Sequence, residues 1–178
     1  MMNINRCVSF GKAIVVSAFP GMGKSYIAKH SDGKKVLDSD SSQFSWLLDS
    51  NGNKILDNNG KPIREPNFPN NYMQHIKDNI DSADIIFVSS HENVRQALND
   101  ENIDHCIVYP REDMKEEMIH RYITRGNDKN FVEMIKENWD KFLERIKNDK
   151  CPNKIEIQPG QYLSDVMPEI KQKMNLSV

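Results

Sequence analysis

The chain lacks the features that mark membrane proteins and disulfide-rich proteins. No apolar run approaches the roughly 18–20 residues of a membrane-spanning helix. The cysteines Cys7, Cys106 and Cys151 are odd in number and far apart, which excludes a disulfide framework and a cysteine-based metal spacing. We therefore expect free thiols and a cytoplasmic protein.

An excess of charge of one sign is also absent. The sequence has 24 basic and 26 acidic side chains, for a net charge of −2 over 178 residues. This balance argues against a protein that coats nucleic acid through bulk charge. It does not exclude a local basic cleft. Mean hydropathy is −0.68, so we expect one polar-surfaced globular domain over residues 1–178. The apolar stretch near the N-terminus runs directly into a glycine loop, and it predicts a buried strand and not a secretion signal.

Short apolar runs alternate with segments of helical periodicity. The runs predict strands at 13–19, 35–38, 84–90, 105–110 and 154–158. Helices are expected at 24–30, 71–80, 92–99, 112–124, 130–147 and 163–174. The first runs are continuous, as in strands buried on both faces, whereas 154–158 alternates and predicts an edge strand. This order predicts a three-layer α/β/α fold around a five-stranded parallel sheet.

One stretch, residues 47–71, breaks this rhythm. It holds two Asn-Gly pairs and three prolines. Asn51-Gly52 and Asn59-Gly60 favour tight turns. We predict a hairpin-like insertion followed by an irregular loop on the substrate side of the fold, with no internal repeat in the chain.

The stretch "SAFPGMGKS" (17–25) predicts a phosphate-binding loop, because it follows a buried strand and opens a helix. Loop amides would cradle phosphate oxygens, Lys24 would reach the β- and γ-phosphates, and Ser25 would bind Mg²⁺. The expected nucleotide-binding residues are Pro20, Gly21, Met22, Gly23, Lys24, Ser25 and Tyr26, together with Arg111.

The first glycine of this loop pattern is missing, and Ala18 stands in its place. Alanine is the smallest departure from glycine, and it fails only where the position needs a positive φ or has no room for a methyl group. The residues expected to hold phosphate lie downstream and are intact. We therefore expect a working site.

Two carboxylates, Asp38 and Asp40, follow the second predicted strand, at the sheet edge where ligands bind in open α/β folds. One would hold Mg²⁺ and the other would orient an acceptor hydroxyl; helix capping is the alternative. The third strand ends in Ser89, Ser90 and His91. Many nucleotide hydrolases carry an acid there, so its absence argues against a motor or switch ATPase and favours a small kinase.

Arg121 and Arg125 are four residues apart and share a predicted helix face, ahead of a possible hinge at Gly126. We predict that 111–127 forms a lid that closes over phosphates and stabilises the transferring group. The alternative is a solvated face on which acidic neighbours pair with these bases. Arg64 and Arg95 are further basic candidates for the acceptor side.

Three motifs, "SAFPGMGKS", "LDSD" (37–40) and "MIHRYITRG" (118–126), resemble those of P-loop small-molecule kinases. This group includes nucleoside monophosphate kinases, shikimate kinase and polynucleotide 5′-kinases. The resemblance implies the sheet order 2-3-1-4-5, with Asp38 supporting Mg²⁺ and Asp40 contacting an acceptor hydroxyl. With "FPNNYMQHI" (68–76), the motifs are also similar to small ATP-binding proteins of phages that infect Gram-positive bacteria. Segment 47–71 is unlike the substrate-binding helices of nucleoside monophosphate kinases.

Together these features predict an ATP- and Mg²⁺-dependent phosphotransferase acting on a nucleotide of the deoxynucleoside monophosphate type. Two alternatives stay open: a polynucleotide 5′-hydroxyl kinase and a nucleotide-binding regulator without transfer activity. Metal binding falls to Ser25 and Asp38. The expected catalytic residues are Lys24, Asp38, Asp40, Arg121 and Arg125.

Overall fold

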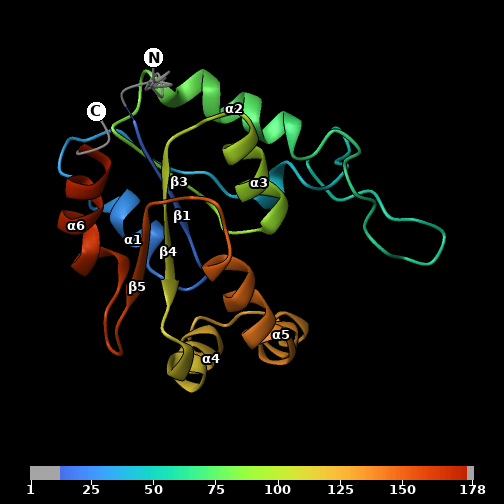
Figure 1. Ribbon diagram of the computed structural model, residues 1–178. Helices are drawn as coiled ribbons and strands as arrows, with labels where there is room; N and C mark the ends of the chain where they lie inside the picture. Colours follow the sequence, from blue (N-terminus) through green and yellow to red (C-terminus); the bar gives the residue numbers. More distant parts are fainter. Residues whose placement is uncertain (1–12, 176–178) are drawn as a thin grey trace, which may run out of the picture.

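The structure is a computed structural model that describes residues 13–175 (Figure 1); Cys7 lies outside the described residues. Five strands form one sheet of order β2-β3-β1-β4-β5, and every pairing is parallel. This confirms the predicted fold class, the sheet order and the edge position of the last strand. The strands are β1 (Ile14–Ala18), β2 (Val36–Asp38), β3 (Ile85–Ser89), β4 (His105–Pro110) and β5 (Lys154–Ile157).

Helices cover both faces of the sheet. Figure 1 shows α1 and α6 on one side of the strands and α2, α3 and α5 on the other. No helix in residues 13–175 is long and apolar enough to cross a membrane. The α-helices are α1 (Lys24–Lys29), α2 (Asn70–Ile80), α3 (Glu92–Asp100), α4 (Lys115–Thr124), α5 (Lys129–Lys147) and α6 (Leu163–Asn175), and two short 3-10 helices are η1 (Ser41–Gln43) and η2 (Glu112–Met114).

The burial of each element follows its sequence pattern. Val15 and Val16 of β1 are fully buried, as expected of a central strand covered on both faces. Helix α5 is capped at its N-terminus, because the Asp128 carboxylate accepts N–H bonds from Asn130 and Phe131. Not all apolar residues of this helix are buried, since Phe131, Met134 and Phe142 stay partly or largely exposed. The residues of α5 that are buried are Val132, Ile135, Trp139, Leu143 and Ile146.

Ala18 is the last residue of β1, where it is fully buried and aligned with Ser89 of β3 and Val108 of β4. Within the loop that follows, positive φ angles occur at Gly21 (77°) and Gly23 (95°). The left-handed turns therefore begin after Ala18, and its position is that of an ordinary strand residue.

The insertion contains a tandem repeat, so the prediction of no internal repeat is wrong. Residues 48–55 read "LDSNGNKI" and residues 56–63 read "LDNNGKPI". In each unit the aspartate carboxylate accepts N–H bonds from the residues two and four positions on, at 2.8 and 2.9 Å. The glycine of each unit has a positive φ, 82° or 76°. Two equivalent turns thus follow one another.

Three backbone hydrogen bonds tie these turns into an arm. Ile55 N–H donates to the Leu47 carbonyl, Ile63 N–H to Ile55, and Leu47 N–H to Ile63, at 2.9, 2.9 and 3.0 Å. A bond from Glu65 N–H to the Ser45 carbonyl closes the base. Residues 45–65, which we call the arm, project away from the sheet and its helices (Figure 1). Helix α2 follows the arm in the chain. The arm is more regular than the predicted hairpin and loop.

Candidate active site

A cavity of about 880 Å³ lies at the carboxyl edge of the sheet. Its walls come from the loop after β1, the segment after β2, the end of β3, helix α4 and the turn after β5. The sheet order brings these segments together, because parallel strands end at one edge. Of the residues expected to form the site, those that line the cavity are Pro20, Gly21, Met22, Gly23, Lys24, Ser25, Tyr26, Asp38, Asp40, Arg121 and Arg125.

The glycine loop is held from above by Tyr122 of α4. The Tyr122 hydroxyl donates to the Pro20 carbonyl at 2.9 Å. A Cβ atom on Gly21 would lie only 2.6 Å from a ring carbon of Tyr122, and the φ of Gly21 is 77°. Gly21 is therefore required both by its backbone conformation and by the close approach of the ring.

Lys24 is partly buried beneath this loop. Its ammonium group donates to the Ala18 carbonyl at 3.0 Å. Burial is the largest influence on the pKa of Lys24 and holds it below the usual range, while the carboxylates of Asp38 and Asp40 act in the opposite direction. An ammonium group has three donors, so Lys24 retains hydrogen-bonding capacity for a ligand oxygen.

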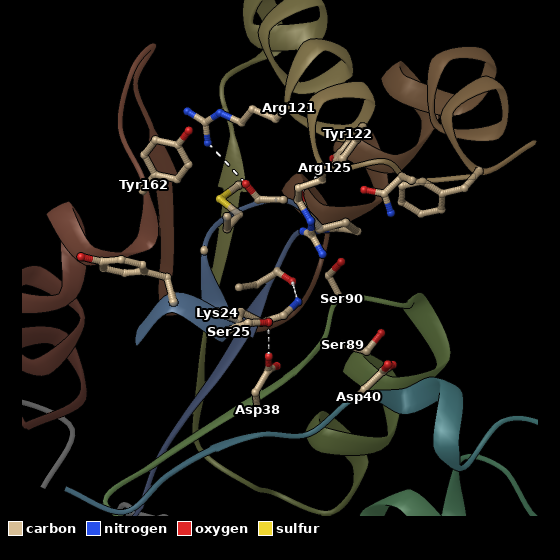
Figure 2. A pocket seen from close by; sticks show the side chains of 18 of the residues that line it. Lys24, Ser25, Asp38, Asp40, Ser89, Ser90, Arg121, Tyr122, Arg125 and Tyr162 are labelled. Atoms are coloured by element: carbon tan, nitrogen blue, oxygen red, sulfur yellow. Dashed lines mark hydrogen bonds between the residues drawn. The ribbon is translucent and has the colours of Figure 1, made fainter. Parts of the chain in front are cut away.

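Ser25 and Asp38 face each other across the floor of the cavity. The Ser25 hydroxyl donates to Asp38 Oδ2 at 2.6 Å (Figure 2). Asp40 is engaged differently, since its Oδ1 accepts the Ser42 N–H at 2.8 Å and caps η1. The predicted alternative of capping thus holds for one oxygen of Asp40, although the residue also lines the cavity.

The two arginines of α4 differ in their environments. Arg121 is buried, donates to Glu117 at 2.5 Å and to the Gln161 carbonyl at 2.8 Å, and lies 3.8 Å over the ring of Tyr162. Arg125 is exposed, and its side chain forms no hydrogen bond or ion pair within residues 13–175. It points into the cavity toward Lys24 (Figure 2). Arg125 is therefore the arginine available to a ligand.

The structure does not bring Arg111 to the cavity. Its guanidinium group binds both carboxylate oxygens of Asp113 at 2.6 Å and Gln158 at 2.6 Å. Arg95 is likewise committed, because it is buried against Asp149 at 2.5 Å and donates to the Ser90 carbonyl at 3.0 Å. Both side chains hold neighbouring segments together.

Several residues that line the cavity are assigned no catalytic or binding role from the sequence. Ser89 is the last residue of β3 and Ser90 and His91 follow it; all three line the cavity. Desolvation lowers the pKa of His91, and Arg64 and Lys24 lower it further. The charge of Arg64 in the arm thus acts on His91 in this wall. His120, from the motif at 118–126, also lines the cavity. Tyr162 lines it as well, but it belongs to no motif and only the fold places it there.

The oxygen ligands of the site fit magnesium. Residues 13–175 contain no group of three or more His, Cys, Asp or Glu side chains that could hold a metal by themselves. Mg²⁺ is commonly held by one or two carboxylates together with substrate phosphates. The adjacent hydroxyl of Ser25 and carboxylate of Asp38 match that requirement beside the loop.

Comparison with known proteins adds little detail. No protein-family model matches the chain, and no curated protein matches it. Among solved structures, the chain is similar to a gluconokinase from Sinorhizobium meliloti 1021, with 14% identity and a TM-score of 0.49 over 94% of this chain and 96% of that one. A likeness this distant assigns no substrate or residue role, so the kinase subfamily and the similarity to phage proteins stay predictions.

Proposed function

We propose that this protein is an ATP- and Mg²⁺-dependent phosphotransferase whose acceptor is a nucleotide of the deoxynucleoside monophosphate type. One observation carries the proposal. The hydroxyl of Ser25 and the carboxylate of Asp38 lie 2.6 Å apart beside the loop lysine, in a single cavity. Residues from two strand ends thus meet as phosphoryl transfer requires.

The loop and Lys24 would position the donor. The left-handed conformation at Gly21 and Gly23 lets the loop backbone approach phosphate oxygens closely. Lys24 would exchange its bond to the Ala18 carbonyl for bonds to the β- and γ-phosphates. The flat pair of Arg121 and Tyr162, on the β5 side of the loop, suits the base of the donor.

Ser25 and Asp38 would hold the metal through their oxygen atoms. When bound, Mg²⁺ would neutralise part of the charge on the phosphates. Asp38 contributes a negative charge to this position, and Lys24 and Arg125 balance it from the opposite side.

Asp40 and Arg125 would act on the transfer itself. An acceptor oxygen attacks the γ-phosphorus, the bond to the β-phosphate oxygen breaks, and ADP leaves. Asp40 would orient the acceptor through its Oδ2, since Oδ1 is used by the cap. Arg125, which is not paired within the described residues, would stabilise the charge on the moving group. Catalysis is then positioning combined with electrostatics.

The charge of Arg64 supports the proposal that the acceptor is phosphorylated. Its guanidinium group lies 3.9 Å over the ring of Trp46 at the base of the arm, and its charge reaches His91 in the cavity wall. A cation on this side would meet the phosphate of an incoming nucleotide.

A second candidate is a polynucleotide 5′-hydroxyl kinase, and Asp40 is the observation that favours it. A hydroxyl must lose a proton during attack, whereas a phosphate oxygen need not. The carboxylate of Asp40 in the cavity could accept that proton.

An acceptor screen tests both proposals. The protein is incubated with γ-labelled ATP, Mg²⁺ and a panel of deoxynucleoside monophosphates, nucleosides and 5′-hydroxyl oligonucleotides. We expect label on a deoxynucleoside monophosphate, and label on oligonucleotides alone would favour the second candidate. Tight ATP binding without transfer would contradict both and support a regulator. Arg125→Ala should lower transfer about a hundredfold, whereas Lys129→Ala, an exposed residue outside the cavity, should not.

A further inference from the structure

A second cavity, of about 350 Å³, lies between α3 and α5; we call it the recess. Phe19 and several apolar residues from one face of α5 form much of its wall. Met134 of this face is 38% exposed although it is apolar. The face is therefore incompletely covered within the described part of the chain, where a fully packed core would bury it. The lining residues from α5 that are apolar are Phe131, Met134, Ile135, Phe142 and Ile146.

The recess adjoins the main cavity. Pro20, Ser90, His91 and Phe131 line both. Ser90 and His91 follow β3, which lies on the β2 side of β1, whereas Tyr162 follows β5 at the other edge of the sheet. The recess thus opens on the acceptor side of the loop, away from the pair of Arg121 and Tyr162.

Charge in the recess is already neutralised. Arg145 pairs with Glu92 at 2.6 Å, which joins α5 to α3. Arg95 is buried in its pair with Asp149. These are the two guanidinium groups of the lining, so a phosphate or carboxylate would find no unpaired arginine or lysine there. The recess therefore favours an uncharged group.

Polar atoms gather where the two cavities meet. The Ser90 hydroxyl and the His91 imidazole lie at this junction, and Asn93 lies beside them in the recess. The lowered pKa of His91 keeps its ring neutral at neutral pH, so that it can donate or accept a hydrogen bond. A ring with an apolar face and a polar edge matches this combination.

We propose that the recess binds the uncharged planar heterocycle of the phosphoryl acceptor, a ring of nucleobase size, whose polar edge is hydrogen-bonded by Ser90 and His91. The volume lies at the small end of ligand sites, which suits a ring system and not a whole nucleoside triphosphate. The assignment rests on the proposed function in placing the reacting end of this acceptor beside Asp40. The partly covered face of α5 is then a specificity surface.

Methyl NMR with benzimidazole, an uncharged planar probe, tests binding directly. The protein is labelled at methionine and isoleucine methyl groups and saturated with a non-hydrolysable ATP analogue. We expect benzimidazole to shift the methyl signals of Met134, Ile135 and Ile146. Met134→Trp should fill the recess and abolish the shifts at both isoleucines. Glu137→Trp, on the exposed side of the same helix, should preserve them.

Shifts that persist in Met134→Trp, or that occur only at methyl groups outside the recess, would overturn the assignment. Thermal melting shows whether each variant is folded. If Met134→Trp does not fold, Phe142→Ala replaces it, because this change removes one aromatic wall. Benzimidazole should then bind about threefold to tenfold more weakly, and unchanged affinity would contradict the proposal.

Kinetics separates this inference from the proposed function. In Met134→Trp we expect kcat/KM for a deoxynucleoside monophosphate to fall at least about tenfold, with the KM for ATP unchanged. Transfer with unaltered acceptor kinetics would overturn the recess assignment alone. Absence of transfer in the wild-type protein would overturn the proposed function, and the benzimidazole shifts would still decide whether the recess binds a ring.

Discussion

The proposed donor and acceptor sides of the cavity are built in different ways. The donor side is one contiguous loop, residues 19–25, whose geometry resides in its backbone and in the left-handed conformation of two glycines. The proposed acceptor side takes its residues from the segments at the ends of β2 and β3, and the charge of Arg64 in the arm acts on it through His91. A backbone loop is specified by local sequence, whereas a wall of side chains from separate strands exists only once the sheet has formed.

This difference also appears in the hydrogen bonds. On the donor side, Lys24 bonds a carbonyl and Tyr122 braces the loop, so the conformation is fixed without a ligand. On the acceptor side, Arg125 and the second oxygen of Asp40 have no hydrogen bond or ion pair within residues 13–175. The donor side is thus preorganised, and the acceptor side keeps groups free for a substrate.

Removal of the loop lysine should have the largest effect and should separate activity from stability. Lys24→Met is expected to lower phosphoryl transfer at least about 10²–10³-fold. The same variant should melt at a higher temperature, because it removes an ammonium group whose pKa burial holds below 10.5. Transfer assays and thermal melts check the two effects. If Lys24→Met still transfers phosphate, the proposed role of the loop in catalysis is wrong.

The sign of the pH dependence follows from the same pKa. Between the lowered pKa of folded Lys24 and 10.5, the unfolded chain binds more protons at this residue. The wild-type free energy of unfolding therefore gains a contribution as pH rises through this window. Lys24→Met should lack that contribution, and identical slopes in denaturant melts of the two proteins would contradict it.

Asp40→Asn tests the acceptor side without disturbing its fold. Asparagine caps helices about as well as aspartate, so the melting temperature should stay unchanged. We expect kcat for a hydroxyl acceptor to fall about 10²-fold or more, since the carboxylate that takes the proton is gone, while the affinity for ATP is preserved. Asp40→Ala serves as the control for the cap and should cost about 1 kcal/mol of stability. If kcat falls only slightly, and equally in both variants, then Asp40 serves only as a helix cap.

Gly21→Ala and Gly52→Ala compare the loop with the arm at similar backbone angles. Their φ values are 77° and 82°, but a Cβ atom meets Tyr122 at 2.6 Å in the first case and nothing within 4 Å in the second. Gly52→Ala should cost about 1–2 kcal/mol in free energy of unfolding. Gly21→Ala should cost more and should also weaken ATP binding. Denaturant melts and calorimetry provide the measurements, and equal costs would mean that the ring of Tyr122 moves aside freely.

Ala18→Gly should have the smallest effect. Because Ala18 is a buried strand residue, glycine there should lower stability by about 0.5–1 kcal/mol and leave turnover unchanged. A gain in turnover would show that the loop is limited by the missing glycine.

The sequence predicts the strands and helices closely, because each combines a clear apolar period with a clear end. Helix α5, with its cap at Asp128, is one example. It does not reveal that Arg111 binds Gln158 or that Arg95 is buried against Asp149. Those partners depend on tertiary packing. Tyr162 belongs to no sequence motif. Only the fold shows that its ring lies under the guanidinium group of Arg121.

The prediction of the arm from the sequence failed for a different reason. The Asn-Gly pairs correctly indicate tight turns, but turn residues taken one pair at a time do not reveal that two eight-residue units follow one another. Both units carry an aspartate that accepts backbone N–H bonds at equivalent positions. An alignment of the sequence with itself would nevertheless detect the repeat. Residues 48–55 align with residues 56–63 at the leucine, aspartate, asparagine, glycine and isoleucine positions.

The most direct test of the account is the Mg²⁺ dependence of binding of a non-hydrolysable ATP analogue, measured by calorimetry. Wild-type protein should bind the analogue more tightly when Mg²⁺ is present. Ser25→Ala should lose most of this gain, whereas Ser42→Ala, a nearby serine outside the cavity lining, should retain it. An equal Mg²⁺ effect in Ser25→Ala and the wild type would contradict the assignment of Ser25 and Asp38 as the metal-binding pair.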